Sequence, residues 1–300
     1  MLDTYNIGLL LLLIVVFLWT SSNFITQNLF DDGFQMPFLV TYFNTASFSV
    51  YLLPLLLYRW PRVSALYSYM PVTEIPEGLS PAEGRKRLPP LSTRETANLA
   101  ILFCFLWFVA NWSQNASLEH TSVASSTILA SMSGFFTLLL GRVFHVEAFS
   151  FVRLGTVMTS FLGVVLVSLA DSDSPDSPLR GRPFSPEGGP SRRPLLGDIL
   201  GLLSAIFYAF YVILLKVRIQ DESRVNMRLF FGFVGLFNVL CMWPIGFLLH
   251  WTKLEPFRLP SSKMQWVAIA VNMAITFSSD YIYVLAMLKT TPWSSPSVSA

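Results

Sequence analysis

The chain alternates long apolar stretches with polar ones, and eight of the apolar stretches are long enough to predict membrane-spanning helices. An α-helix needs roughly 17 to 25 residues to cross the hydrocarbon core of a bilayer. The eight stretches cover residues 7–25, 38–58, 98–118, 121–141, 154–170, 199–215, 229–249 and 265–288. The pattern therefore predicts an all-α, polytopic membrane protein.

Two polar segments interrupt this pattern and divide the chain. Residues 59–97 are rich in charge and proline and have too few apolar side chains for a core, which predicts a flexible cytosolic loop. Residues 171–196 are rich in proline, serine and glycine, which predicts a disordered linker. We expect a first repeat over residues 1–170, with five helices, and an incomplete second repeat over residues 197–300, with three.

A short internal match supports the two repeats. Ala116 is followed five residues later by Thr121-Ser122, and Ala286 is followed at the same spacing by Thr291-Pro292. The stretch 265–288 is therefore the predicted counterpart of 98–118, and each is the third stretch of its half. A five-helix repeat has an odd number of crossings, so its second copy inserts upside down. The expected architecture is ten helices in two inverted five-helix repeats, of which eight are visible.

Composition agrees with a membrane protein and excludes several function classes. Hydrophobic residues make up 53% of the chain and charged residues 13%, whereas soluble domains are about 25% charged. The sequence has no basic run with interleaved aromatics, so a nucleic-acid partner is not expected. It also has no metal-ligand spacing, nucleophile elbow or phosphate loop, so we expect no metal, no cofactor and no enzyme. A polytopic membrane enzyme would need acids or histidines clustered at one membrane face.

The distribution of basic residues predicts the orientation in the membrane. With the N-terminus in the cytosol, 13 of the 20 Lys and Arg residues lie on the cytosolic side and 7 on the other side. An excess of basic residues in cytosolic loops is typical of membrane proteins. We therefore expect a cytosolic N-terminus.

Small side chains recur at spacings that favour close helix packing. These candidate packing positions are Ser126, Ala130 and Gly134 in the fourth stretch, Gly163 in the fifth, and Gly201 and Ala205 in the sixth.

Asp280 is the clearest candidate functional residue, because it is the one acid well inside an apolar stretch. A charge at membrane depth costs at least ~2.5 kcal/mol on insertion scales, so the side chain should face the bundle interior or a water-filled cavity. It could bind a cationic part of a substrate or a proton; the alternative is a structural partner for a helix end or for Tyr281. Further candidates for a central cavity are Gln27, Asn44, Asn111, Tyr208 and Asn238. For each of these the alternative is an interhelical hydrogen bond, worth about 0.6 kcal/mol.

Several motifs together resemble a known family. They are Leu18-Trp19-Thr20-Ser21-Ser22, Phe105-Leu106-Trp107-Phe108, Ser133-Gly134-Phe135-Phe136, residues 230–238 and Ser279-Asp280-Tyr281. The pattern resembles the drug/metabolite transporter superfamily (EamA-like) and, within it, solute carrier family 35, F subgroup, which includes vacuolar-membrane and thiamine-transporter-like members. The resemblance implies ten helices and movement of organic solutes by alternating access.

The function expected from this resemblance is secondary transport of a small organic solute across an endomembrane, vacuolar or Golgi, with the lipid bilayer and the solute as partners. After Thr291-Pro292 the family would continue into a ninth helix, and Trp293-Ser294-Ser295-Pro296 does not match it. The alternative is a truncated, non-transporting membrane protein, either an isoform or a partial gene model. Such a protein would associate with a full-length partner or form a homo-oligomer.

Overall fold

The computed structural model describes residues 4–54, 90–144, most of 151–166, 194–219 and 224–290. Within these ranges the chain forms helices and no strands, which confirms the predicted all-α class. The elements are α1 (Thr4–Asp31), α2 (Pro37–Ala46), the 3₁₀ helix η1 (Ser47–Leu52), α5 (Thr93–His120), α6 (Val123–Ser131), α7 (Ser133–Val143), α9 (Pro194–Ile219), α10 (Met227–Cys241), α11 (Trp243–Trp251) and α12 (Lys263–Thr290).

Five helical segments are long and apolar enough to cross a bilayer. They are Asn6–Asp31, Thr93–His120, Val123–Val143, Leu195–Ile219 and Met227–Trp251. They correspond to the first, third, fourth, sixth and seventh predicted stretches, although the fourth begins two residues later than predicted, at Val123. The other three predicted stretches, which fall on α2 with η1, on residues 151–166 and on α12, stay predictions as membrane crossings.

Two predicted polar segments are shorter than expected, because each is entered by a helix. Helix α5 begins at Thr93, inside the predicted loop 59–97, since Ser92 and Glu95 form a capping box. The hydroxyl of Ser92 accepts a hydrogen bond from the Glu95 N–H (3.3 Å), and the Glu95 carboxylate accepts one from the Ser92 N–H (2.8 Å). Helix α9 likewise begins at Pro194, within the predicted linker. The rest of the loop up to residue 89, and residues 171–193 of the linker, lie outside the described residues.

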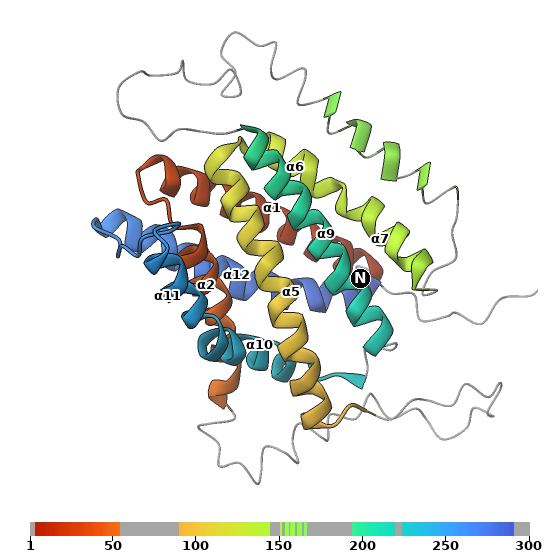
Figure 1. Cartoon of the computed structure of the whole chain (residues 1–300). Helices are drawn as coiled ribbons and strands as arrows, with labels where there is room; N and C mark the ends of the chain where they lie inside the picture. The colour runs from red at the N-terminus through yellow and green to blue at the C-terminus, as the bar shows by residue number, and fades with distance from the viewer. Residues whose placement is uncertain are drawn as a thin grey trace, which may run out of the picture.

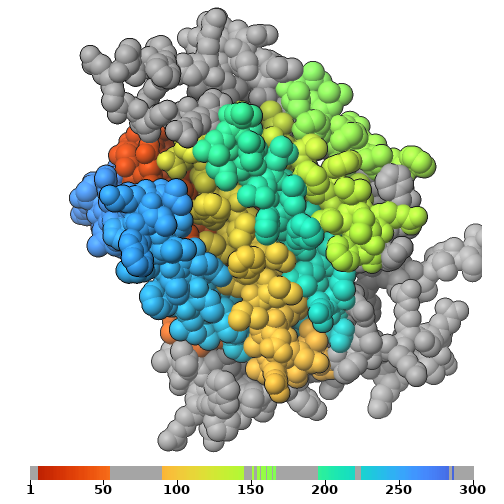
Figure 2. All heavy atoms as spheres, in the orientation of Figure 1, coloured from red at the N-terminus to blue at the C-terminus, as the bar shows by residue number. Residues whose placement is uncertain are grey.

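The helices pair across the two halves of the chain. Helix α1 packs along α12, α5 packs along α9, and the segment α2–η1 packs against α10 (Figure 1). In Figure 2, α5 and α9 run side by side across the visible face. Each of these three pairs joins a helix from before the linker to one from after it.

A buried aromatic cluster holds the middle of the bundle together. Phe48 of η1, Phe103 of α5 and Phe230 of α10 are each at most 1% exposed. Phe103 makes an edge-to-face contact with Phe230, with ring centroids 5.0 Å apart. Val234 lies in the same cluster on the next turn of α10. Burial of these side chains fixes how α10 sits against η1 and α5.

Helix α10 approaches η1 at a glycine. A Cβ atom at Gly235 would lie 2.6 Å from the carbonyl carbon of Phe48 and 2.9 Å from the Cα of Ser49. Both are backbone atoms, so glycine is required for this approach.

Candidate functional site

Polar side chains of α12 face α1 inside the bundle. The amide nitrogen of Asn272 donates to the hydroxyl of Thr26 (2.7 Å), and the amide oxygen of Asn272 accepts from the hydroxyl of Ser22. Two turns further along α12, the hydroxyl of Ser279 accepts a hydrogen bond from the Trp19 indole (3.1 Å). Asn272 and Ser279 are fully buried. These contacts join the first half of the chain to the second in the part of the bundle where Asp280 lies.

Asp280 lies in the bundle interior, where we expected it. Its side chain is 4% exposed, and its Oδ2 has no hydrogen-bond partner among the described residues. The carboxyl group interacts electrostatically with the hydroxyls of Tyr51 on η1 and of Tyr208 and Tyr211 on α9. The structure therefore brings together two predicted site residues, Asp280 and Tyr208, with two further tyrosines.

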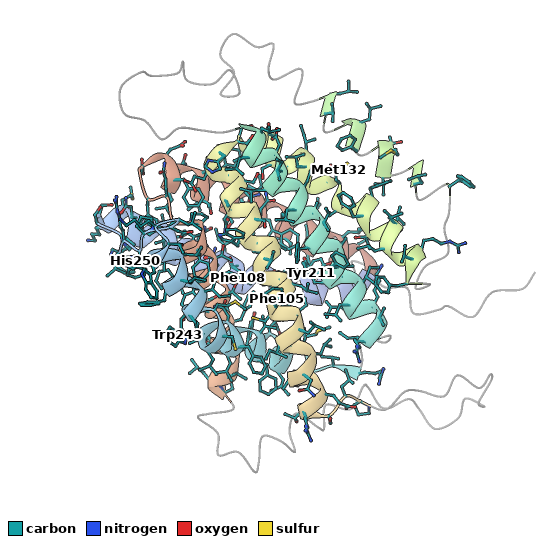
Figure 3. The ribbon with its side chains drawn as sticks, viewed as in Figure 1. Phe105, Phe108, Met132, Tyr211, Trp243 and His250 are labelled. Carbon is teal, nitrogen blue, oxygen red and sulfur yellow. The ribbon has the colours of Figure 1, made fainter. Side chains whose placement is uncertain are left out.

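Aromatic rings surround these hydroxyls. Tyr211 lies 4.7 Å from Tyr208 and 5.2 Å from Trp107, measured between ring centroids. On the other side, Tyr51 stacks on Phe277 of α12 with centroids 4.3 Å apart. Figure 3 places Tyr211 on α9, where that helix passes α5. The tyrosines that interact with Asp280 thus belong to a wider set of packed aromatic rings.

A cavity of about 480 Å³ opens beside Tyr51, at the end of the bundle where η1 ends and α10 begins. Arg228 lines this cavity, and its Nη2 donates to the hydroxyl of Tyr281 (2.7 Å). The hydroxyl of Tyr51 donates to the backbone carbonyl of Phe277 (2.7 Å). Tyr51 therefore both lines the cavity and interacts with Asp280. We call this end of the bundle the Arg228 face.

The other predicted polar residues lie at separate positions. Asn238 is fully buried on α10 and donates from its amide to the backbone carbonyl of Tyr42 (3.0 Å). Gln27 donates to the carbonyl of Thr121 at 3.3 Å. Asn111 donates to the carbonyl of Trp107 within its own helix at 2.8 Å. The Oδ1 of Asn44 is buried and has no hydrogen-bond partner in the described part of the chain.

The predicted packing positions also differ in their surroundings. Ser126 and Ala205 are buried, whereas a Cβ at Gly163 would meet nothing within 4 Å. A Cβ at Gly201 would lie 2.8 Å from the Leu129 Cδ1, so α9 lies close to α6 there. One at Gly134 would make an ordinary contact of 3.6 Å with Val157. Ala130 is half-buried.

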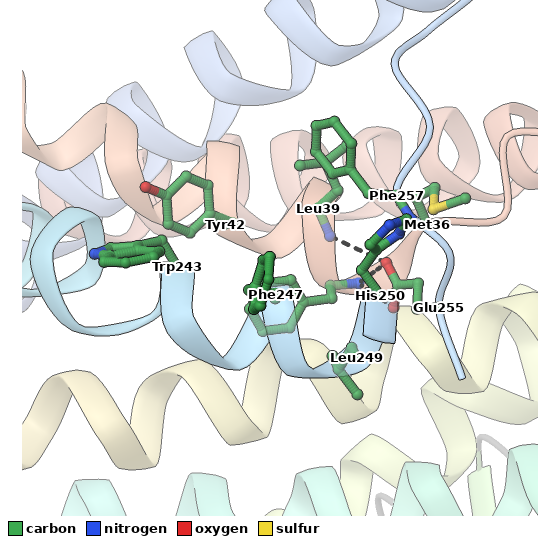
Figure 4. A pocket seen from close by; sticks show the side chains of 11 residues that line it. Met36, Leu39, Tyr42, Trp243, Phe247, Leu249, His250, Glu255 and Phe257 are labelled. Atoms are coloured by element: carbon green, nitrogen blue, oxygen red, sulfur yellow. Dashed lines mark hydrogen bonds between the residues drawn. The ribbon is translucent and has the colours of Figure 1, made fainter. Parts of the chain in front are cut away.

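A second cavity, of about 330 Å³, lies at the opposite end of the bundle between α2 and α11. Trp243 and His250 lie near the two ends of α11 (Figure 3). Both line this cavity, together with Tyr42 and Phe247 (Figure 4). Glu255 also lines it, and its carboxylate accepts hydrogen bonds from the backbone N–H groups of Phe38 and Leu39. We call this end the Glu255 face.

Sequence reasoning missed Tyr51, Ser279 and Glu255. Tyr51 and Ser279 lie inside apolar stretches, where a tyrosine or serine is ordinary, and Glu255 lies in a connection where an acid is ordinary. For Ser279 a signal existed, because it directly precedes Asp280 in the sequence. Glu255 carried none, since its partners lie 216 and 217 residues away.

The described residues place polar groups in the bundle interior and along two cavities. No group of three or more His, Cys, Asp or Glu side chains that could hold a metal ion occurs among them. What they provide is a buried carboxyl group, a set of tyrosines and two cavities at opposite ends of the bundle.

The comparisons with known proteins point to membrane transport. No family model matches the chain. The chain is 42% identical over 290 residues to an uncharacterized transporter of Schizosaccharomyces pombe, covering 96% of this chain and 82% of that protein. It is 37% identical over 310 residues to an uncharacterized vacuolar membrane protein of Saccharomyces cerevisiae, covering 96% and 79%. It is also 37% identical over 202 residues to solute carrier family 35 member F5 of Mus musculus, covering 66% and 36%.

Proposed function

Because the chain belongs to the F-like group of solute carrier family 35, within the drug/metabolite transporters, we propose that it moves a small organic solute by alternating access between two inverted repeats. Membrane transport of a solute is what the relatives' names have in common. The inverted repeats and the alternation are our proposal.

The observation that carries this proposal is the pairing of helices. If the halves are inverted repeats, α1 corresponds to α9, α5 corresponds to α12, and α2–η1 corresponds to α10. Exchanging each helix for its counterpart turns the pair α1·α12 into the pair α9·α5. These are the two most extensive helix pairs in the described part of the chain. Because α2–η1 and α10 are each other's counterparts, the same exchange leaves their pair unchanged. A two-fold relation between the halves accounts for all three pairs.

The polar groups at the contacts between the halves supply a binding site for this mechanism. Asp280 comes from the second half and Tyr51 from the first, and the aromatic side chains of α5 and α9 complete the surroundings. In transporters built from repeats, the substrate site lies near the bilayer midplane where the repeats meet. We propose that Asp280 binds either a cationic part of the solute or a coupling proton.

The two cavities mark the two ends from which such a site would open. One lies at the Arg228 face and the other at the Glu255 face, on opposite ends of α2–η1 and of α10–α11. Under the predicted orientation the Arg228 face is cytosolic. We further propose an endomembrane location, in line with the vacuolar membrane named for one relative.

Exchange of solutes by reconstituted protein tests the proposal. Proteoliposomes containing the purified chain are loaded with a cell extract of small metabolites, washed, and analysed by mass spectrometry over time, beside protein-free vesicles. We expect a small set of organic solutes to leave the protein-containing vesicles faster, and an excess of the same solute outside to accelerate their exit. Equal loss from both kinds of vesicle would contradict transport. Exit without acceleration by external solute would contradict alternating access.

A further inference from the structure

The N-terminus of α2 is capped by a carboxylate from the other half of the chain. Pro37, the first residue of α2, has no N–H group, and the N-cap residue Met36 makes no side-chain cap. The N–H of Phe38 lies 3.0 and 3.1 Å from the two Glu255 oxygens, and that of Leu39 lies 3.3 Å from one of them. The N–H of Val40 donates to the Met36 carbonyl. Glu255 therefore satisfies both N–H groups that the first turn of α2 leaves free.

This contact joins the two halves of the chain at the Glu255 face. Leu39 lies behind it and is 7% exposed, and both Leu39 and Glu255 line the 330 Å³ cavity. Glu255 lies in the connection between α11 and α12, whereas α2 belongs to the first half of the chain. Separation of the two halves at this face requires the carboxyl group to leave the α2 N-terminus. The contact, which we call the Glu255 latch, thus exists in the closed arrangement of this face.

Resting on the alternating access proposed above, we propose that Glu255 is a proton-binding site that locks this face of the transporter in its closed arrangement. In the latch the carboxyl group is partly buried and lies in the cavity lining with Leu39 and Phe257 (Figure 4). When the face opens, the same group returns to water. The two arrangements therefore differ in their affinity for a proton.

Burial raises the pKa of Glu255 to about 7, against the lowering effect of the two backbone N–H groups of α2. Negative charge on Glu119 of α5 raises the pKa further. The other titratable groups lining the cavity are His250 of α11, whose Nδ1 accepts from the Phe257 N–H, and Tyr42 of α2. The latch therefore contains a carboxyl group that is neutral below about pH 7.

The sign of the pH effect follows from linkage. In the open arrangement a water-exposed Glu has its ordinary pKa of about 4.3. In the closed arrangement the pKa of Glu255 is higher, so proton binding favours that arrangement. The extra stability of the closed arrangement is fully present below about pH 4.3 and is lost as the pH rises through 7. Acidification closes this face and a neutral pH releases it. A protonated carboxyl group keeps its carbonyl oxygen as an acceptor for the α2 N–H groups.

Thiol labelling tests the latch without requiring transport. Cys104 and Cys241 are both free, so both are first replaced by serine. Leu39→Cys then places a thiol behind the latch, and its reaction with a membrane-impermeant thiol reagent is followed in purified protein between pH 5.5 and pH 8.5. Rates are divided by those of Leu254→Cys, which is exposed beside the latch. This ratio removes the reagent's own pH dependence. We expect it to rise by up to about tenfold per pH unit below pH 7 and to level off above.

Variants at position 255 make the test specific. Glu255→Gln keeps the acceptor oxygen but cannot ionise, so we expect slow labelling at every pH, no faster than that of the Glu255 protein at pH 5.5. Glu255→Ala removes the cap, so we expect fast labelling at every pH. His250→Asn should leave the pH response in place. A pH response that persists in Glu255→Gln, or that vanishes in His250→Asn, would overturn the proposal.

The outcome is separable from that of the transport assay. A Glu255-dependent labelling response in a protein that exchanges no solute would support the latch and contradict the proposed transport. Solute exchange with pH-independent labelling would contradict the latch and leave transport standing.

Discussion

The side-chain amide of Asn272 donates a 2.7 Å hydrogen bond to the hydroxyl of Thr26, and this bond joins α12 to α1 in the interior of the bundle. Both side chains are at most 2% exposed. The amide oxygen of Asn272 also accepts from Ser22, so one side chain bonds to two positions on the facing helix. A single amide thus holds two helices from different halves of the chain in register.

Replacing Asn272 by Ala should destabilise the α1–α12 pair. Interhelical hydrogen bonds contribute about 0.6 kcal/mol each on average, so we expect a loss of about 1 kcal/mol for the two bonds. The measurement is thermal unfolding of the purified protein in detergent. Ser278→Ala on the same helix is the matched control, because its hydroxyl donates to carbonyls of α12 itself. Equal effects of the two substitutions would contradict a tie between α1 and α12.

Gly235→Ala should be strongly destabilising, because the added Cβ would overlap backbone atoms of Phe48 and Ser49 in η1. Neither helix can move away without disturbing the buried aromatic cluster, and overpacking of this kind costs typically 1–3 kcal/mol. At Gly232, one turn earlier on α10, the added atom would meet the side chain of Leu52 instead. That flexible side chain can shift, so we expect a smaller effect.

Thermal unfolding of the two glycine variants tests this difference. Gly155→Ala serves as the control, since a Cβ there meets nothing within 4 Å. A Gly235 variant as stable as the Gly155 variant would show that the α10–η1 approach is looser than the structure describes.

The hydropathy pattern was sufficient to predict an all-helical chain and the position of its five membrane-length helical segments, but not their partners. The apolar stretch 98–118 predicts a helix because no other backbone satisfies its own hydrogen bonds in lipid. The cost of burying a charge likewise predicts that Asp280 faces inward. The start of α5 could also have been predicted, since Ser92-Thr93-Arg94-Glu95 is a capping-box sequence. The remaining features depend on tertiary packing. Nothing near Glu255 in the sequence indicates that it caps a helix 216 residues away.

Asp280→Asn should strongly reduce transport while leaving the fold intact or making it more stable. The carboxyl group is 4% exposed, and its Oδ2 lacks a hydrogen-bond partner among the residues that the structure describes. A charge at membrane depth costs at least ~2.5 kcal/mol on insertion scales, and an amide of the same shape avoids that cost. Functional residues often reduce stability in this way. We therefore expect at least a tenfold loss of solute exchange, together with an unchanged or higher unfolding temperature.

Two controls separate a binding role from a structural role for Asp280. Asp32→Asn removes an exposed carboxyl group from the connection between α1 and α2. This variant should change neither solute exchange nor the unfolding temperature. Asp280→Glu keeps the charge but lengthens the side chain, so we expect partial transport at a lower unfolding temperature. Asp280→Asn also tests the structural role. If it lowers the unfolding temperature, and solute exchange falls only as much as the amount of folded protein, then Asp280 is a structural partner of its neighbouring helices. Loss of exchange in a protein of equal or greater stability can come only from the chemistry of the carboxyl group, because the helices around it remain packed.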